Sequence, residues 1–308
     1  MDMKWRLLSL MLMLTSLSCD AAPPEEAGKV SWGRDLGTAL ASSRESGRPV
    51  FALFQEIPGC AGCKQFGRDV LSNPLVVEAI ETEFTPLLIH NNKGGKDAEV
   101  LQRYGEPAWN FQVVRFLDAK GNDIISRRDQ VWETCALSER MIAALMNARR
   151  PVPGYLGLLA SEHFPRLKQA VFTMHCFWTG EMALGQIEGV ISTEAGFMGG
   201  HEVTRVSYDP QAMPLSKLIA AAEKVDCARA VHVPATDVGE AKAARLQVGV
   251  ISGYQSAPAS DQKRQISGTA LDRLHLTGAQ ATKMNAWLRS DAARALSFLT
   301  PSQRAQVK

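Results

Sequence analysis

The chain has 308 residues, of which 45% are hydrophobic and 21% are charged, and its formal net charge is +2 at pH 7. This length predicts about two domains, and this composition predicts packed cores rather than disorder. The small net charge, without any basic run that is interleaved with aromatic residues, argues against a nucleic-acid partner.

The first residues have the pattern of an export signal. Lys4 and Arg6 precede an apolar stretch at residues 7–17, which has the short length of a signal-peptide core. We therefore expect residues 1–22 to be a signal peptide or a lipoprotein signal, and the protein to be exported to the periplasm or another extracytoplasmic compartment. In the lipoprotein alternative Cys19 carries the lipid, and this anchor is the expected contact with a membrane. After the N-terminus, no apolar stretch is long enough to span a bilayer.

A CxxC pair, Cys60-Ala61-Gly62-Cys63, lies between an apolar β-type stretch at residues 48–56 and a helical pattern at residues 64–71. Both sulfurs are thus expected at the start of a helix, where backbone N–H groups and the helix dipole favour the thiolate. A structural zinc site needs about four clustered ligands, and only one CxxC pair is present. We expect redox chemistry without a metal or cofactor, with a static disulfide or a zinc half-site as alternatives.

The order of the following elements is similar to that of the thioredoxin fold, over residues 30–148. The pattern predicts strands at residues 83–89 and 111–117, helices at residues 97–104 and 135–147, and a hairpin turn at residues 120–122. In the thioredoxin family a cis-proline faces the CxxC sulfurs. The resemblance gives this role to Pro107, although residues 108–110 lengthen its approach to the next strand.

The chain then passes through a linker and a connecting helix at residues 149–168, where prolines and a glycine gather. Residues 169–300 are expected to form an α+β two-layer sandwich. Its predicted strands cover residues 170–174, 189–197, 202–208 and 246–251, and its predicted helices cover residues 176–187, 215–225 and 278–288.

Cys176 lies at the predicted turn between a strand and a helix N-terminus in this second domain. That position favours a nucleophilic thiolate. Phe177 and Trp178 follow directly and can form an apolar wall beside the sulfur. A reactive sulfur beside a small apolar pocket indicates a substrate that is partly polar and partly methyl-like.

The motifs around this thiol resemble A-type peptide methionine sulfoxide reductase, over residues 169–255. The matching segments are Cys176-Phe177-Trp178, residues 189–193, residues 196–200 and residues 208–210. The resemblance implies that Cys176 attacks the sulfoxide sulfur, that Phe177 and Trp178 hold the S-methyl group, and that the S epimer is the substrate. It also implies that Glu202 protonates the sulfoxide oxygen, with Asp237 in a supporting role near the substrate.

Attack at sulfur expels an oxygen that must receive a proton, and a carboxyl group such as that of Glu202 can deliver it. The product is a sulfenic acid on Cys176, which a second thiol must reduce. The family loop that carries a tyrosine and often a recycling cysteine is absent, because His201 and Glu202 directly follow Gly200. We therefore predict that Cys227 resolves the sulfenic acid.

The leading interpretation is thiol-dependent reduction of methionine sulfoxide in peptides or proteins, with Cys60 and Cys63 as the fused reductant. Covalent linkage is expected to raise the reductant's effective concentration. An upstream thiol-disulfide donor must then reduce the CxxC pair. One alternative is a thiol-disulfide oxidoreductase with a degenerate, non-catalytic reductase-like domain. Another is a non-enzymatic anchored scaffold with structural disulfides.

Overall fold

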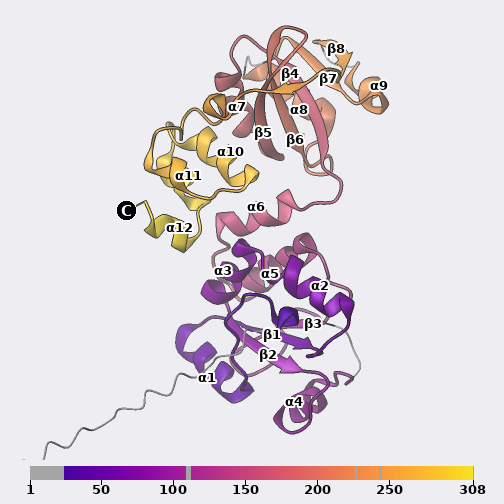
Figure 1. The fold of residues 1–308 in the computed structure, drawn as a ribbon, viewed down its shortest axis with the longest axis vertical. Helices are drawn as coiled ribbons and strands as arrows, with labels where there is room; N and C mark the ends of the chain where they lie inside the picture. The colour runs from indigo at the N-terminus through magenta and orange to yellow at the C-terminus, as the bar shows by residue number, and fades with distance from the viewer. Residues whose placement is uncertain (1–23, 109–111, 226–227, 243–244, 308) are drawn as a thin grey trace, which may run out of the picture.

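Two sheets, each covered by helices, form the N-terminal and C-terminal units of the chain (Figure 1). The computed structural model describes residues 24–108, 112–225, 228–242 and 245–307. The predicted signal at residues 1–22, with Cys19, lies outside this part of the chain, as does Cys227. None of the helices in the described ranges has both the length and the apolar character that crossing a membrane requires.

The N-terminal unit has a three-stranded sheet in the order β2-β1-β3, in which β2 is parallel to β1 and β3 is antiparallel to it. Every residue of β1 is buried because apolar side chains of helices cover both of its faces. The strands are β1 (Val50–Gln55), β2 (Thr85–His90) and β3 (Val113–Leu117). The helices are η1 (Glu25–Ala27), α1 (Leu36–Ser46), α2 (Ala61–Asp69), α3 (Pro74–Glu83), α4 (Lys96–Tyr104) and α5 (Thr134–Asn147).

The C-terminal unit has a six-stranded mixed sheet in the order β8-β7-β4-β6-β5-β9. Only the β7–β8 pair is parallel among the pairings of these strands in the described ranges. The strands are β4 (Lys168–Thr173), β5 (Val190–Met198), β6 (His201–Tyr208), β7 (Ala230–Val233), β8 (Gln247–Val250) and β9 (Gln255–Ser256). The helices are α7 (Phe177–Gly185), α8 (Leu215–Lys224), η2 (Ala235–Asp237), α9 (Val238–Ala241), η3 (Ala259–Asp261), η4 (Ala270–Arg273), α10 (Gly278–Trp287), α11 (Ala292–Ser297) and α12 (Pro301–Ala305).

Helix α6 (Gly154–Glu162) joins the two units and contributes to the cores of both. Its Tyr155, Leu156 and Leu159 are buried in the core of the N-terminal unit. From the same helix, Leu158 packs against Ile191 of β5. The connecting helix predicted from the sequence is thus a shared core element.

Pro107 does not carry the cis peptide bond that was expected from the resemblance. Within the described ranges the cis bond is Ile57–Pro58. The side chain of Glu106 accepts hydrogen bonds from Arg115 Nε and Arg127 Nε, both at 2.7 Å, which fixes the chain just before Pro107. Several residues then separate Pro107 from β3, so Gln112, not a proline, directly precedes the strand.

Candidate functional site

The first thiol centre is the CxxC pair at the start of α2. Cys60 is the N-cap residue of this helix and is exposed, whereas Cys63 in its first turn is fully buried. The two Sγ atoms lie 3.4 Å apart, and both cysteines are free thiols. A small movement can therefore close the disulfide, and only Cys60 is open to an attacking partner.

The surroundings give these two thiols opposite acidities. A hydrogen bond from the backbone N–H of Cys63 lowers the pKa of Cys60. Burial raises the pKa of Cys63 to about 12, and its hydrogen bond with Cys60 adds to this increase. Because the thiolate is the reactive form, this arrangement makes Cys60 the nucleophile and Cys63 the resolving thiol.

Buried polar groups hold the segment that leads into the CxxC pair. Glu26 accepts a hydrogen bond from the backbone N–H of Gly59 at 2.8 Å, and Gln55 Nε2 donates to Cys63 O at 3.2 Å. A Cβ atom on Gly59 would lie 2.7 Å from the Cβ atom of Cys63. Glycine is thus required there for the backbone to pass this close to the buried sulfur.

A cavity of about 390 Å³ adjoins the CxxC helix. Gly62 and Phe66 of α2 line it, together with Trp132 near the start of α5 and His163 after α6. Gln112 also lines this cavity, and its buried Oε1 accepts no hydrogen bond from the described residues. The cavity therefore offers apolar contact and the Gln112 carbonyl oxygen as an acceptor next to the CxxC segment.

The second thiol centre is Cys176, which is half-buried and is the N-cap residue of α7. The preceding Met174 is buried, and its Sδ accepts a hydrogen bond from Thr204 Oγ1 at 3.2 Å. A Cβ atom on Gly180 would overlap this Met174 sulfur. Glycine in α7 thus lets the helix approach the end of β4 closely, which fixes the Cys176 sulfur at the helix N-terminus.

Glu202 of β6 reaches the same helix start. Its Oε2 accepts a hydrogen bond from the backbone N–H of Phe177 at 2.8 Å, on the residue that follows Cys176. This contact places the Glu202 carboxyl group at the N-terminus of α7, on the backbone of the residue that follows Cys176. The pairing of Glu202 with Phe197 of β5 sets the position of Glu202 along β6.

Three aromatic rings form a cluster next to Cys176. Phe177 meets Trp178 at a centroid distance of 5.8 Å and Phe197 at 5.5 Å, and both contacts are T-shaped. The indole N–H of Trp178 donates to Asp261 O at 3.0 Å. Phe197 is 40% exposed, so the cluster opens to solvent and can receive a methyl group.

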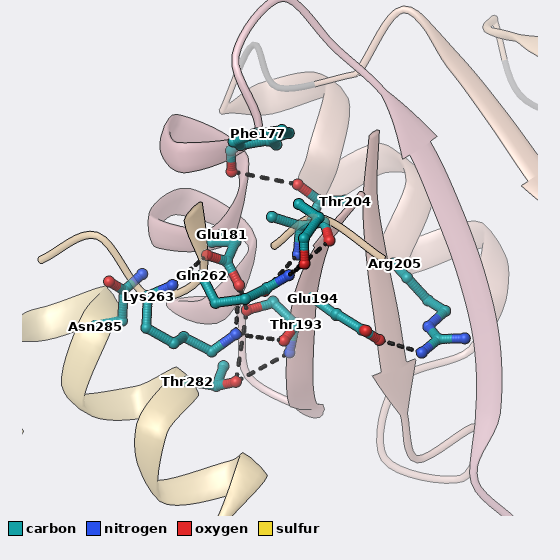
Figure 2. A network of polar contacts seen from close by, with 12 residues as sticks. Phe177, Glu181, Thr193, Glu194, Thr204, Arg205, Gln262, Lys263, Thr282 and Asn285 are labelled. Atoms are coloured by element: carbon teal, nitrogen blue, oxygen red, sulfur yellow. Dashed lines mark hydrogen bonds and ion pairs between the residues drawn. The ribbon is translucent and has the colours of Figure 1, made fainter. Parts of the chain in front are cut away.

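A polar network holds the segment at residues 259–265 against α7 and β5 (Figure 2). The fully buried Glu181 of α7 accepts from the backbone N–H of Lys263 at 2.8 Å and pairs with the Lys263 ammonium group. The same ammonium group donates to Thr193 O at 2.6 Å. Gln262 binds both the N–H and the carbonyl of Ala195. This network fixes Asp261 and, through its carbonyl group, the orientation of Trp178.

The structure brings Cys176, Phe177, Trp178 and Glu202 together, but it does not bring Asp237 to them. Asp237 accepts a hydrogen bond from Lys168 Nζ at 2.9 Å, at the beginning of β4. Cys176 follows the other end of β4, about 17 Å away by the rise of a strand. The Asp237 carboxyl group therefore stabilises the sheet edge and does not contact the thiol.

The lost family loop is replaced by a tight hairpin. Met198 of β5 pairs with His201 of β6, and only Gly199 and Gly200 connect them. Their φ angles are 58° and 79°, which two-residue hairpin turns of this kind require and glycine readily adopts. No residue of this turn can supply the tyrosine of the family loop.

The sequence has two further cysteines after residue 24, Cys135 and Cys227. Cys135 is a buried free thiol, and burial raises its pKa to about 11. Cys227 lies outside the described residues, and its predicted resolving role stays a prediction. In the described ranges, no group of three or more His, Cys, Asp or Glu side chains could hold a metal ion.

Phe197 and the Glu181–Lys263 pair are parts of the site that were not predicted from the sequence. The role of Phe197 could have been predicted, because the alternation of side chains along a strand places it on the face of β5 beside the thiol. Glu181 lies four residues after Phe177 and thus on the same face of α7, so a carboxylate on this inward face needed a cation. Its partner lies 82 residues further along the chain, and no local pattern indicates it.

Models of two known protein families match the two parts of the chain that contain these centres. A thioredoxin-like family model matches residues 31–119, and a peptide methionine sulfoxide reductase family model matches residues 168–213. The thioredoxin-like α/β region followed by a sandwich of methionine sulfoxide reductase type is confirmed as the chain's organisation.

Individual relatives match the C-terminal part of the chain. Peptide methionine sulfoxide reductase MsrA of Methanothermobacter thermautotrophicus is 31% identical in an alignment 134 positions long, which covers 35% of this chain and 75% of that protein. MsrA 1 of Nostoc sp. is 28% identical in an alignment 119 positions long, which covers 33% of this chain and 73% of that protein.

Solved structures give weaker likenesses. A structure titled DsbH Oxidoreductase covers 42% of this chain and 92% of its own, with 18% identity and a TM-score of 0.33. Mxr1 from Saccharomyces cerevisiae in an oxidised form covers 30% of this chain and 78% of its own, with 16% identity and a TM-score of 0.27.

Proposed function

The chain belongs to the peptide methionine sulfoxide reductase MsrA family, and on that premise we propose that it reduces methionine sulfoxide in peptides or proteins. The S epimer is the proposed substrate, and the CxxC pair is the proposed reductant. One observation carries this proposal: the Cys176 thiol lies at the N-terminus of α7, with the Glu202 carboxyl group on the next N–H and an aromatic cluster beside it.

The first half-reaction uses Cys176 as the nucleophile. Its thiolate attacks the sulfoxide sulfur while the S-methyl group lies against Phe177 and Trp178. The sulfoxide oxygen takes a proton from Glu202 and is transferred to the Cys176 sulfur, which releases methionine and leaves a sulfenic acid. Glu202 is the acid that lies at the helix start, and this position supports its role.

The second half-reaction returns Cys176 to the thiol. The dithiol of Cys60 and Cys63 supplies two electrons and becomes a disulfide, and the sulfenic oxygen leaves as water. The accessible, more acidic Cys60 supports its role as the attacking thiol. Cys227 is proposed to form an intermediate disulfide with Cys176, which Cys60 then reduces.

Stereoselective turnover tests this proposal. The Cys60→Ser/Cys63→Ser chain is assayed with the separate S and R epimers of N-acetylmethionine sulfoxide. Dithiothreitol is the reductant in this assay, because it can reduce the oxidised form of Cys176 directly. We expect turnover of the S epimer, and Cys176→Ser added to this background should remove it. Absence of turnover by the folded Cys60→Ser/Cys63→Ser chain would contradict the proposal.

A second candidate function is thiol-disulfide exchange by the CxxC pair on other proteins, with the C-terminal unit as a binding module. The observation that favours it is the cavity lined by Gly62 of the CxxC segment, in which Gln112 Oε1 accepts no hydrogen bond from the described residues. Reduction of a mixed-disulfide peptide by the Cys176→Ser chain measures this activity separately. A chain that exchanges disulfides without reducing either sulfoxide epimer would favour this candidate.

We also propose export, on the basis of the residues 1–22 pattern, with a lipid on Cys19 as the alternative to a soluble mature form. Mass spectrometry of the N-terminal peptide from membrane and soluble fractions distinguishes a lipidated Cys19 from a free, cleaved terminus. An intact Met1 in the mature protein would contradict cleavage.

A further inference from the structure

We propose that the CxxC pair of one chain reduces the Cys176 centre of a second chain. This inference rests on the proposed function and deepens it, because it names the partner of the recycling step. The partner is a second copy of the same chain, although the two centres are covalently joined within each copy. The reason lies in how α6 fixes the two units.

Helix α6 is fastened to both units by side-chain contacts. On the N-terminal side, the hydroxyl groups of Tyr155 and Thr82 lie 3.4 Å apart within a closed core. On the C-terminal side, Glu162 Oε1 accepts a hydrogen bond from the backbone N–H of Ala279 at 3.1 Å. A further contact between the units bypasses α6, since the backbone N–H of Ser302 donates to Glu78 Oε1 at 2.7 Å. These contacts hold the units in one relative orientation.

The Cys176 centre lies at the end of the C-terminal sheet that points away from this junction. Strand β5 begins at the junction, where Ile191 packs on Leu158 of α6, and it ends at Met198. The rise of a strand puts these two residues about 23 Å apart. Glu202, which binds the helix start beside Cys176, pairs with Phe197 at the far end.

The CxxC pair lies on the other side of α6. Gly62, between the two cysteines, and His163, directly after α6, line the same cavity. Figure 1 shows the two sheets on opposite sides of α6, with the strands of the C-terminal sheet extending away from it. A disulfide requires Cα atoms within about 7 Å, and the length of β5 alone exceeds this reach. Within one chain, Cys60 therefore cannot attack the Cys176 centre in this arrangement.

Both centres are nevertheless open to another molecule. Cys60 is exposed, and Cys176 is half-buried beside Phe197, which is 40% exposed. In the encounter, the oxidised Cys176 of one chain accepts two electrons from Cys60 and Cys63 of the other. Over the whole recycling reaction Cys176 returns to the thiol, the sulfenic oxygen leaves as water, and the donor chain keeps a Cys60–Cys63 disulfide. Covalent linkage thus supplies the two centres in equal number, although the two centres of one chain do not react with each other.

A mixing experiment with two complementary variants tests this step. The Cys60→Ser/Cys63→Ser chain carries only the Cys176 centre, and the Cys176→Ser chain carries only the CxxC centre. Both are reduced, freed of reductant, and mixed with N-acetylmethionine-(S)-sulfoxide. We expect one methionine from each Cys176 centre alone and a second equivalent once the Cys176→Ser chain is added. The matched control is the Cys60→Ser/Cys63→Ser/Cys176→Ser chain, which should add nothing.

The unmodified chain provides a readout that does not depend on variants. The initial rate of its second equivalent should rise about tenfold per chain when the protein is about tenfold more concentrated, because the step is bimolecular. The inference would be overturned by two results together. The initial rate per chain would not depend on protein concentration, and the mixture of variants would yield no second equivalent of methionine. Absence of even the first equivalent would instead refute the proposed function.

Discussion

Replacement of Lys263 by methionine tests whether the buried network of the C-terminal unit holds the aromatic cluster. Lys263→Met keeps most of the side-chain volume but removes the ammonium group that pairs with Glu181 and donates to Thr193 O. Glu181 is fully buried, so its carboxylate then loses the Lys263 ammonium group and cannot reach water. The segment that carries Asp261 loses its main attachment to α7.

The structure sets the expected magnitude. Removal of one member of a buried ion pair costs about 3–5 kcal/mol of unfolding free energy, because it leaves an uncompensated charge. Glu181→Gln should cost less, about 1–3 kcal/mol, because its amide oxygen can still accept a hydrogen bond from Lys263, and the Lys263 ammonium group, whose side chain is 14% exposed, still donates to Thr193 O. The Glu181→Leu/Lys263→Met double variant should be more stable than Lys263→Met, which makes the coupling measurable.

Hydrogen–deuterium exchange of β5 and α7 peptides along a urea gradient measures the unfolding free energy of the C-terminal unit by itself. A single unfolding transition of the whole chain would not separate the two units. Lys217→Met on the exposed face of α8 is the matched control and should stay within about 0.5 kcal/mol of the parent. Trp178 should also lose its fixed orientation in Lys263→Met, with a larger increase in KM than decrease in kcat. A cost for Lys263→Met equal to that of Lys217→Met would refute this reasoning.

Three further predictions concern the two thiol centres. Cys176→Ser should abolish sulfoxide reduction without loss of folded structure, checked by turnover and circular dichroism; retained activity would remove Cys176 from the mechanism. Glu202→Gln should lower kcat by about 10²–10⁴-fold because it still accepts from the Phe177 N–H but cannot deliver a proton; a loss below about threefold would assign the proton to another acid. Iodoacetamide should modify Cys60 well before Cys63, because a hydrogen bond lowers the pKa of Cys60 and burial raises the pKa of Cys63 to about 12. Peptide mapping that finds Cys63 modified first would reverse their roles.

Local patterns predicted the elements that carry the two nucleophiles. The CxxC helix, α7 and the β5–β6 hairpin follow from apolar periodicity and from turn residues close in the sequence. Helices α1 and α3 were missed although their N-caps are readable: Asp35 caps α1, and Asn73 before a proline caps α3. Strand β7 was missed because four residues are too few to establish alternation.

Relations between distant segments could not be predicted. The resemblance placed Pro107 opposite the CxxC pair, but the residues after it displace it from β3. It also placed Asp237 near the substrate, whereas the structure pairs it with Lys168 at the other end of β4. The position of the two centres on opposite sides of α6 depends on packing between the units, which no local pattern encodes.

The proposed function depends above all on the reduction of the methionine sulfoxide sulfur by Cys176. Its most direct test is mass spectrometry of the Cys60→Ser/Cys63→Ser/Cys135→Ser/Cys227→Ser chain after one equivalent of N-acetylmethionine-(S)-sulfoxide, with dimedone present. We predict one methionine per chain and one dimedone adduct on the Cys176 peptide, because no resolving thiol remains. Unchanged sulfoxide with an unmodified Cys176 peptide, in a chain that exchange measurements show to be folded, would contradict the account.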